Sequence, residues 1–230
     1  MNAYDEIERR TTFRIPDLYR RMCKDGVCNY AGSPQEWQSV WRRRALENPP
    51  ALLGALDFEW LGLDEMMSWS PPDDWLPEHL FVPFGQTGAG DCYAWYPAWA
   101  EGDSVPVVLA WHDDNRCECL APHLEGFLYR QTLEALTYVD PRRAQRRGFT
   151  SDEARQALRA NIDVLRPYLR PSWMADLDGL SAREPREWSR KLPRTLETFV
   201  SQLGERELEE RLSRELSFSK LNAEFDHMKP

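Results

Sequence analysis

The feature that most constrains the fold is a change in the spacing of apolar residues at Leu80. Four short apolar segments follow it, "LFVPF", "DCYAWYP", "VPVVLAWH" and "CECL", separated by Gly, Pro, Asp and Asn. Short runs rich in Val, Phe, Tyr and Trp that are divided by turn residues are typical of consecutive strands. Helical periodicity precedes and follows them, so we predict an α+β fold in which an antiparallel sheet is flanked by helices.

Several helix ends are visible in the sequence. "FRIPDLYRRMCKDG" has Pro16 in the first turn and Gly26 at the C-terminal cap, which are the favoured positions of these residues. Two further helix starts have the spacing of a capping box: Ser33 with Glu36, and Thr150 with Glu153. After Asp140, apolar residues recur at helical spacing as far as Phe225. We therefore predict an α+β domain over residues 1–140 and an all-helical extension over residues 141–230 that packs on it.

Acidic residues are concentrated in the middle of the chain. Residues 51–140 hold sixteen Asp or Glu and two Arg, a net charge of −14 in a chain whose net charge is −9. Such a surface attracts cationic partners and repels nucleic acid. The basic stretch "RRAQRR" at residues 142–147 lacks interleaved aromatics, so a solvated connector explains it better than a phosphate-binding patch.

The five cysteines and the first residues of the sequence indicate in which cellular compartment the protein is expected. The count of Cys is odd, no basic and apolar leader opens the sequence, and no run is long enough to span a membrane. These features favour reduced thiols over a disulfide framework. We expect a cytoplasmic protein without a membrane partner.

The glycine-rich stretch "FVPFGQTGAGDCYAW" allows two interpretations. A phosphate-binding loop requires particular glycine spacing, and the P-loop adds Lys before Ser or Thr. Here Gly85, Gly88 and Gly90 are spaced GxxGxG and are followed by Asp91, whose carboxylate opposes anion binding. We therefore predict a tight turn in which glycine adopts positive φ and Asp91 bonds local backbone amides.

Metal and catalytic patterns are weak. His112, Cys117, Cys119 and His123 could supply four zinc ligands, but the cysteines are spaced CxC instead of CxxC, and small buried hydrophobes explain them more simply. The motifs GxSxG and HExxH are absent, and adjacent Asp113 and Asp114 fit a turn. We expect no catalytic residue, no metal, no cofactor and no small-molecule substrate.

Three stretches occur in a characteristic order. The first is the predicted helix from Pro16 to Gly26. The second is "FGQTGAGDCYAW", which follows a predicted strand in the sequence. The third is "VPVVLAW", followed by an acidic hairpin and a helix that contains Phe127. Over roughly residues 10–138 the chain resembles the SUKH superfamily, which contains bacterial toxin-immunity proteins and fungal cell-wall assembly regulators. The resemblance implies an α+β fold with an antiparallel sheet, and a non-enzymatic inhibitor of a cognate toxin.

The resemblance and the acidic centre together suggest a partner-binding surface. In a strand over residues 91–96, Tyr93 and Trp95 share one face and Cys92 and Ala94 share the other, so the aromatic side chains are either core or exposed anchors. The candidate partner-binding residues are Asp91, Trp95, Trp99, Glu101, Asp103, Trp111, His112, Asp113, Asp114 and Glu118. The partner would be a basic toxin, such as a nuclease. The alternative is an interaction module of a regulatory complex that docks through its C-terminal extension.

Overall fold

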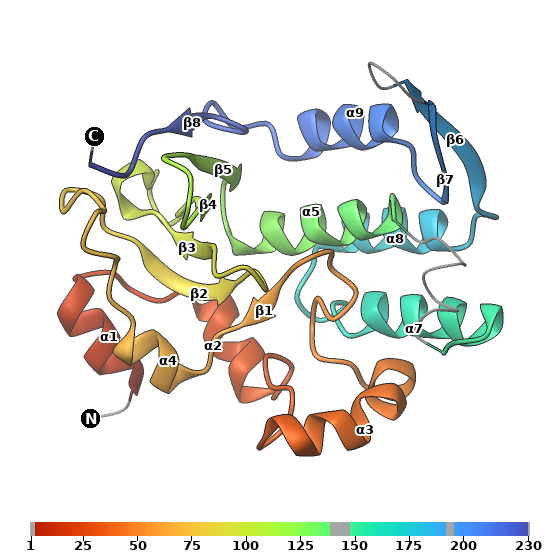
Figure 1. Cartoon of the computed structure of the whole chain (residues 1–230), viewed down its shortest axis with the longest axis horizontal. Helices are drawn as coiled ribbons and strands as arrows, with labels where there is room; N and C mark the ends of the chain where they lie inside the picture. Colours follow the sequence, from red (N-terminus) through yellow and green to blue (C-terminus); the bar gives the residue numbers. More distant parts are fainter. Residues whose placement is uncertain (1–2, 139–147, 192–195, 230) are drawn as a thin grey trace. The chain divides into compact units, whose positions relative to one another are not determined.

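The computed structural model describes residues 3–138, 148–191 and 196–229 (Figure 1). The chain divides into two compact units. The sheet unit comprises Met1–Asn29, Asp57–Phe127 and Leu216–Pro230, and the hairpin unit comprises Tyr30–Leu56 and Leu128–Glu215. The predicted boundary at residue 140 and the basic connector at residues 142–147 lie outside the described residues.

An antiparallel sheet organises the sheet unit (Figure 1). Among the described residues it has six strands in the order β1-β2-β3-β4-β5-β8, and each neighbouring pair is antiparallel. The strands are β1 (Glu59–Trp60), β2 (Val82–Gln86), β3 (Cys92–Trp95), β4 (Val107–Ala110), β5 (Cys117–Ala121) and β8 (Glu224–Phe225). This confirms the predicted α+β class and the antiparallel sheet.

Helices of the sheet unit gather near β1 and β2 (Figure 1). They are α1 (Ala3–Thr11), α2 (Asp17–Lys24) and α4 (Leu63–Ser68), and α5 (Leu124–Leu136) also begins in this unit. Helix α2 starts directly after Pro16, and Gly26 beyond its end adopts a φ of +75°. The predicted C-terminal end at Gly26 is confirmed, whereas Pro16 is the residue before the helix and not part of its first turn.

One face of the sheet packs around Trp95, which is fully buried. Its ring centroid lies 4.5 Å from that of Phe84 on β2 and 5.1 Å from that of Tyr19 on α2. On the same face, Tyr93 packs on Phe127 of α5 at 5.4 Å. These contacts confirm that Tyr93 and Trp95 share a face, and they make both side chains part of the core.

The opposite face is covered by residues 216–229, here called the C-terminal segment, together with aromatic side chains such as Trp75 and Phe81. Small side chains from three strands form this face: Cys92, Ala94, Val108, Ala110, Cys117 and Cys119. Phe218, Phe225 and Met228 pack against the cluster that these residues form. All four residues of β3 are buried, so neither face of this strand is open.

Hydrogen bonds hold the C-terminal segment in place. The side-chain oxygen of Asn115, in the β4–β5 turn, accepts from the backbone amides of His227 at 2.8 Å and Met228 at 2.6 Å. The imidazole of His227 has no exposed surface, and its Nε2 lies 3.1 Å from the carbonyl oxygen of Trp111. The C-terminal segment is therefore fixed to the same turn that joins β4 to β5.

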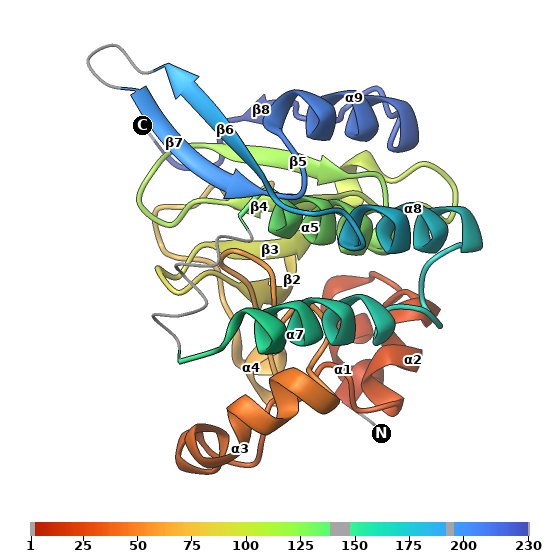
Figure 2. The same cartoon turned by 90° about the vertical axis from the view of Figure 1, so that its right-hand side faces the viewer.

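The expected all-helical C-terminal extension is wrong. Helices α3 (Pro34–Glu47), α7 (Ser151–Asp163), α8 (Pro171–Ser181) and α9 (Glu205–Glu215) lie in the hairpin unit, but so do β6 (Arg186–Lys191) and β7 (Leu196–Ser201). The two strands form an antiparallel hairpin (Figure 2). The Trp188 side chain packs over Gly204, where an added Cβ would lie 2.6 Å from the ring. Short apolar runs fit helical and strand spacing equally, and here tertiary packing decides between them.

The glycine-rich stretch forms a strand and a turn, and the structural reason for glycine differs from one position to the next. Gly90 has a φ of +101° and closes the turn by donating to the Thr87 carbonyl oxygen at 3.1 Å, whereas Gly85 and Gly88 do not have positive φ. Gly85 lies in β2, where an added Cβ would lie 2.5 Å from Cε2 of Phe58. The prediction of positive φ is thus confirmed for Gly90 alone. The Gly88 amide donates to the Asp57 carboxylate at 2.7 Å.

Replacing Gly85 with alanine will destabilise the sheet unit. The new methyl group overlaps the Phe58 ring, and overpacking of this kind costs about 2 kcal/mol. Gly88→Ala is the matched control, because its Cβ would make an ordinary 3.4 Å contact with Asp57, and its effect should stay within about 0.5 kcal/mol. Equal free energies of urea unfolding for the two variants would contradict the assigned packing.

Replacing Asn115 with alanine will loosen the C-terminal segment. The amides of His227 and Met228 lose their acceptor, which costs about 2 kcal/mol in the free energy of unfolding. Asn115→Asp keeps an acceptor oxygen at the same position and should retain most of the stability. If Asn115→Ala unfolds at the same urea concentration as the unmodified chain, these two hydrogen bonds do not anchor the segment.

Candidate functional site

The predicted partner-binding residues lie at two opposite ends of β4. Glu101 and Asp103 are exposed in the β3–β4 loop, whereas His112, Asp113 and Asp114 are exposed in the β4–β5 turn. Four residues of strand separate the two groups, a length of roughly 13 Å at about 3.3 Å per residue. The acidic surface expected from the sequence is therefore divided into a loop pair and a turn group.

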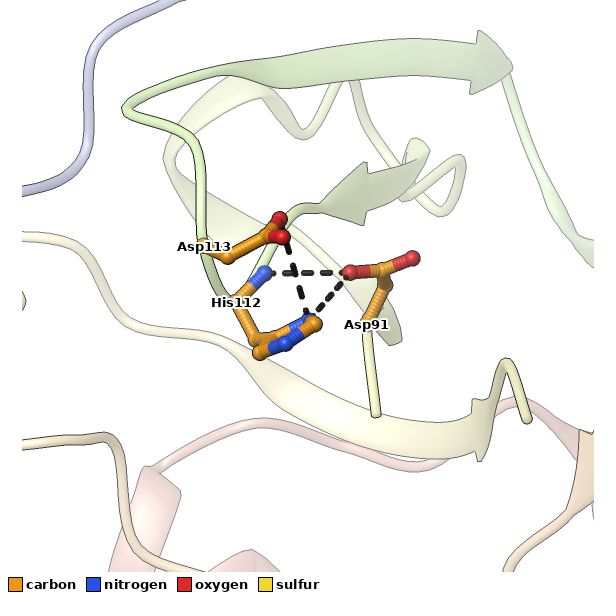
Figure 3. Close-up of side chains that lie close together, drawn as sticks. All are labelled: Asp91, His112 and Asp113. Carbon is orange, nitrogen blue, oxygen red and sulfur yellow. Dashed lines mark hydrogen bonds and ion pairs between the residues drawn. The ribbon is translucent and has the colours of Figure 1, made fainter. Parts of the chain in front are cut away.

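At the turn, Asp91 and His112 form a hydrogen-bonded pair (Figure 3). Oδ1 of Asp91 accepts from the backbone amide of His112 at 3.1 Å and lies 2.7 Å from its Nδ1, and Oδ2 accepts from the Thr87 hydroxyl at 2.9 Å. Asp113 approaches the same imidazole, with its Oδ1 at 4.0 Å from Nδ1. Asp91 thus ties the β2–β3 turn to the β4–β5 turn. Its carboxylate accepts from the amide of a distant residue and from a local hydroxyl, so the predicted bonding to local backbone amides is wrong.

These contacts shift both pKa values. Burial of Asp91 opposes its ionisation, but hydrogen bonds from the His112 ring and amide and from Thr87 outweigh it and hold the pKa below its ordinary value of 3.8. The hydrogen bond to Asp91, assisted by the charge of Asp113, raises the pKa of the exposed His112 above its ordinary value of 6.5. The imidazole is consequently charged over a wider pH range than a free histidine.

The Asp–His pair resembles the orienting half of a catalytic triad. In the described part of the chain no hydroxyl or thiol bonds the other ring nitrogen of His112, and the Thr87 hydroxyl donates to Asp91 instead. Asp91, His112 and Asp113 also offer three donor atoms within 4.8 Å of one another, which a divalent cation could share. What the geometry itself supplies is a fixed, readily charged imidazole between two carboxylates.

Arg116 and the C-terminal segment extend the acidic group. The Arg116 guanidinium lies over the Trp111 ring at 3.9 Å and within 3.8 Å of Asp114 and 3.7 Å of Glu224. Glu224 of β8 pairs in register with Glu118 of β5. We call this set the turn edge: Asp91, His112, Asp113, Asp114, Arg116, Glu118 and Glu224. Sequence reasoning missed Glu224, because no local signal indicates that residues so far along the chain join this sheet.

The predicted aromatic anchors are largely occupied by the protein itself. Trp95 has no exposed surface, so its assignment to a partner-binding surface is wrong. Trp99, in the 3-10 helix η1 (Pro97–Trp99), is half-buried against Phe225 at 4.8 Å, with the Lys220 ammonium 5.2 Å from its ring centre. Trp111 is half-buried beneath Arg116. Trp99 and Trp111 therefore keep only part of their surface for a contact with a partner.

The four residues considered as zinc ligands are not brought together. Cys117 and Cys119 are fully buried on the face covered by the C-terminal segment. His112 is exposed beside Asp91, and Nδ1 of His123 accepts from the Gly126 amide at 3.0 Å at the start of α5. The side chains therefore act in separate local contacts, as the interpretation of buried small hydrophobes requires.

A hollow of about 270 Å³ lies elsewhere in the sheet unit. Its lining includes Ile7, Met66, Trp69, Leu80, Phe81 and Pro83, and none of the predicted site residues lines it. It forms between α1, α4 and the proline-rich stretch before β2. The hollow therefore had no recognisable sequence signal.

Comparisons of the chain with protein-family models, curated proteins and solved structures found no match. Within the described residues, no helix combines the length and the apolar character needed to cross a membrane.

The ionisation of His112 provides a test of the site geometry. The charged pair is complete between the ordinary pKa values of 3.8 for Asp91 and 6.5 for His112, and it is lost as the pH rises through the raised pKa of His112 or falls through the lowered pKa of Asp91. In an NMR titration His112 should titrate above 6.5. The Asp91→Asn substitution should lower the pKa of His112, and Asp113→Asn should lower that pKa less. A wild-type value at or below 6.5 would rule out this pairing.

Proposed function

We propose that the protein is a non-enzymatic inhibitor that binds a basic toxin through the turn edge. The distribution of charge carries this proposal. The sheet unit holds 21 Asp or Glu and nine Lys or Arg, a net charge of −12, whereas the hairpin unit holds 17 Asp or Glu and 20 Lys or Arg, a net charge of +3. The acidic excess of the chain therefore belongs to the sheet unit.

Part of this negative charge is exposed at the turn edge. Asp113, Asp114 and Glu224 keep 72%, 62% and 56% of their side-chain surface exposed. Exposed carboxylates of this kind accelerate encounter with a basic surface and repel phosphate backbones. The half-buried Trp111 under Arg116 adds an aromatic surface and a planar cation, both of which are enriched at binding hot spots.

The class of partner comes from the resemblance to the SUKH superfamily. The stretches that carry it form α2, the β2–β3 turn, the β4–β5 hairpin and α5, which all belong to the sheet unit apart from the end of α5. Immunity proteins of that superfamily act by binding a toxin, and a cationic toxin such as a nuclease would complement the turn edge. The inhibitor would cover the toxin's active site or its substrate path.

The first test is capture followed by neutralisation. The immobilised chain is exposed to a lysate of its source cells at about 0.5 M salt, where exposed charges are screened, so that only contacts with a packed centre persist. The proposal expects one near-stoichiometric basic protein whose expression is toxic and whose toxicity is relieved by co-expression of this chain. A captured partner without toxicity would contradict the inhibitor assignment and favour the interaction module.

The second test asks whether the turn edge is the surface that the partner meets. Asp113→Asn with Asp114→Asn should slow association with that partner roughly tenfold at low salt, because steering charges act mainly on the association rate. Glu101→Gln with Asp103→Asn is the charge-matched control at the other end of β4, and it should change the rate far less. An equal effect of the two double variants would show that net charge, and not the turn edge, governs the encounter.

A further inference from the structure

The hollow between α1, α4 and the stretch before β2 has an apolar interior. Ile7 of α1 and Met66 of α4 line it, and Trp69 and Phe81 add two aromatic rings. Its volume is about 270 Å³, whereas an apolar cavity of about 150 Å³ is already large enough to bind benzene. The hollow can therefore hold an apolar group somewhat larger than one aromatic ring.

The walls of the hollow are formed by side chains and backbone that are already fixed. The ring of Trp75, which is buried, lies 6.0 Å from that of Trp69 and 5.1 Å from that of Phe81, measured between ring centroids. Pro71 and Pro77 also line the hollow, and the ring of a proline restricts its backbone φ. A ligand therefore loses little affinity to ordering of the protein when it binds.

One side chain of the lining carries a permanent positive charge. This is Arg10 of α1, and in the described part of the chain it forms no ion pair. Two glutamates of the same helix are engaged by other arginines: Glu6 lies 2.6 Å from Arg9, and Glu8 lies 2.6 Å from Arg20. The charge of Arg10 is therefore available to an anionic ligand.

The guanidinium of Arg10 is oriented by the chain and keeps donors to spare. A guanidinium has five N–H donors, and Nη1 of Arg10 donates to the carbonyl oxygen of Met67 in the last turn of α4. The remaining donors suit a carboxylate, which arginine can bind through two parallel hydrogen bonds. Two other polar groups of the lining are used within the protein: the Thr11 hydroxyl donates to a carbonyl oxygen of its own helix at 2.8 Å, and Nδ1 of His79 lies 2.7 Å from the Tyr96 hydroxyl.

We propose that the hollow binds a small aromatic carboxylate, whose ring packs against Trp69 and Phe81 and whose carboxylate is held by Arg10. None of the described residues that line the hollow is acidic, although the sheet unit as a whole carries a net charge of −12. The lining therefore favours an anion over a cation or a neutral molecule of the same shape. This binding site goes beyond the proposed inhibitory function and is separate from the turn edge, none of whose residues lines it.

The test compares two probes that share an apolar body and differ in their polar end. Phenylpropanoate carries a carboxylate, and phenylpropanol carries a neutral hydroxyl group in its place. Each is titrated at neutral pH into the isotope-labelled full chain, and the amide signals are followed by NMR. We expect phenylpropanoate to shift the signals of lining residues such as Thr11, Ser70 and Leu80 with a Kd of about 1 mM, and phenylpropanol to bind roughly tenfold more weakly. Equal Kd values for the two probes, or no binding of phenylpropanoate at this site, would overturn the proposal.

Two arginine variants at neighbouring positions test the carboxylate contact. Arg10→Gln removes the charge while its amide can still donate to the Met67 carbonyl oxygen, so it should weaken phenylpropanoate binding about tenfold and leave phenylpropanol binding unchanged. Arg9→Gln removes the same charge from an arginine that pairs with Glu6 and does not line the hollow, so it should change the Kd less than about twofold. Trp69→Leu should weaken both probes alike, because their shared ring loses an aromatic wall. An equal loss of phenylpropanoate affinity in the two arginine variants would show that general charge attracts the acid, and would contradict the proposal.

Discussion

The structure of the sheet unit depends on the docking of residues 216–229 onto the sheet. β8 extends the sheet beyond β5, and Asn115 accepts hydrogen bonds from two amides near the end of the chain. Phe225 stacks on Tyr96 at 4.9 Å and covers a sheet face made of small side chains. Without this segment part of that face would be exposed to water, because the other aromatic side chains on it, such as Trp75 and Phe81, would lose the contacts of Phe225 and Met228. The end of the sequence is therefore part of the core.

The packing of residues 216–229 on the sheet determines which side chains remain exposed for contact with a partner. Trp95 lies in the core, and Trp99 and Trp111 are partly covered by Phe225 and Arg116. What remains exposed at the turn edge is mostly charge. Charge sets the rate and selectivity of encounter more than the final affinity, so a tight complex would also need the partner to pack against the uncovered surface of the tryptophans. Under the proposed function, the carboxylates would steer the partner and a small aromatic area would provide the affinity.

The sequence predicts those features whose causes are local. The C-terminal end of α2, the capping box at Thr150 and the two faces of β3 follow from residue type and spacing, and so does the acidic turn at residues 112–114. The β6–β7 hairpin could not be predicted, because its apolar residues fit helical spacing as well and Trp188 selects the strand by packing on Gly204. The contribution of Glu224 to the site depends on long-range pairing that no local pattern records.

Hydrogen exchange of the unmodified protein tests the closure of the sheet most directly. The amides of Asn222, His227 and Lys229 donate to Cys119, Asn115 and Asp74 in this structure. They should therefore exchange as slowly as the amides of β4 that face neighbouring strands, because one cooperative unit protects both. Exchange of these three amides at the rate of an unstructured chain, with β4 still protected, would contradict the account and leave one face of the sheet open to partners.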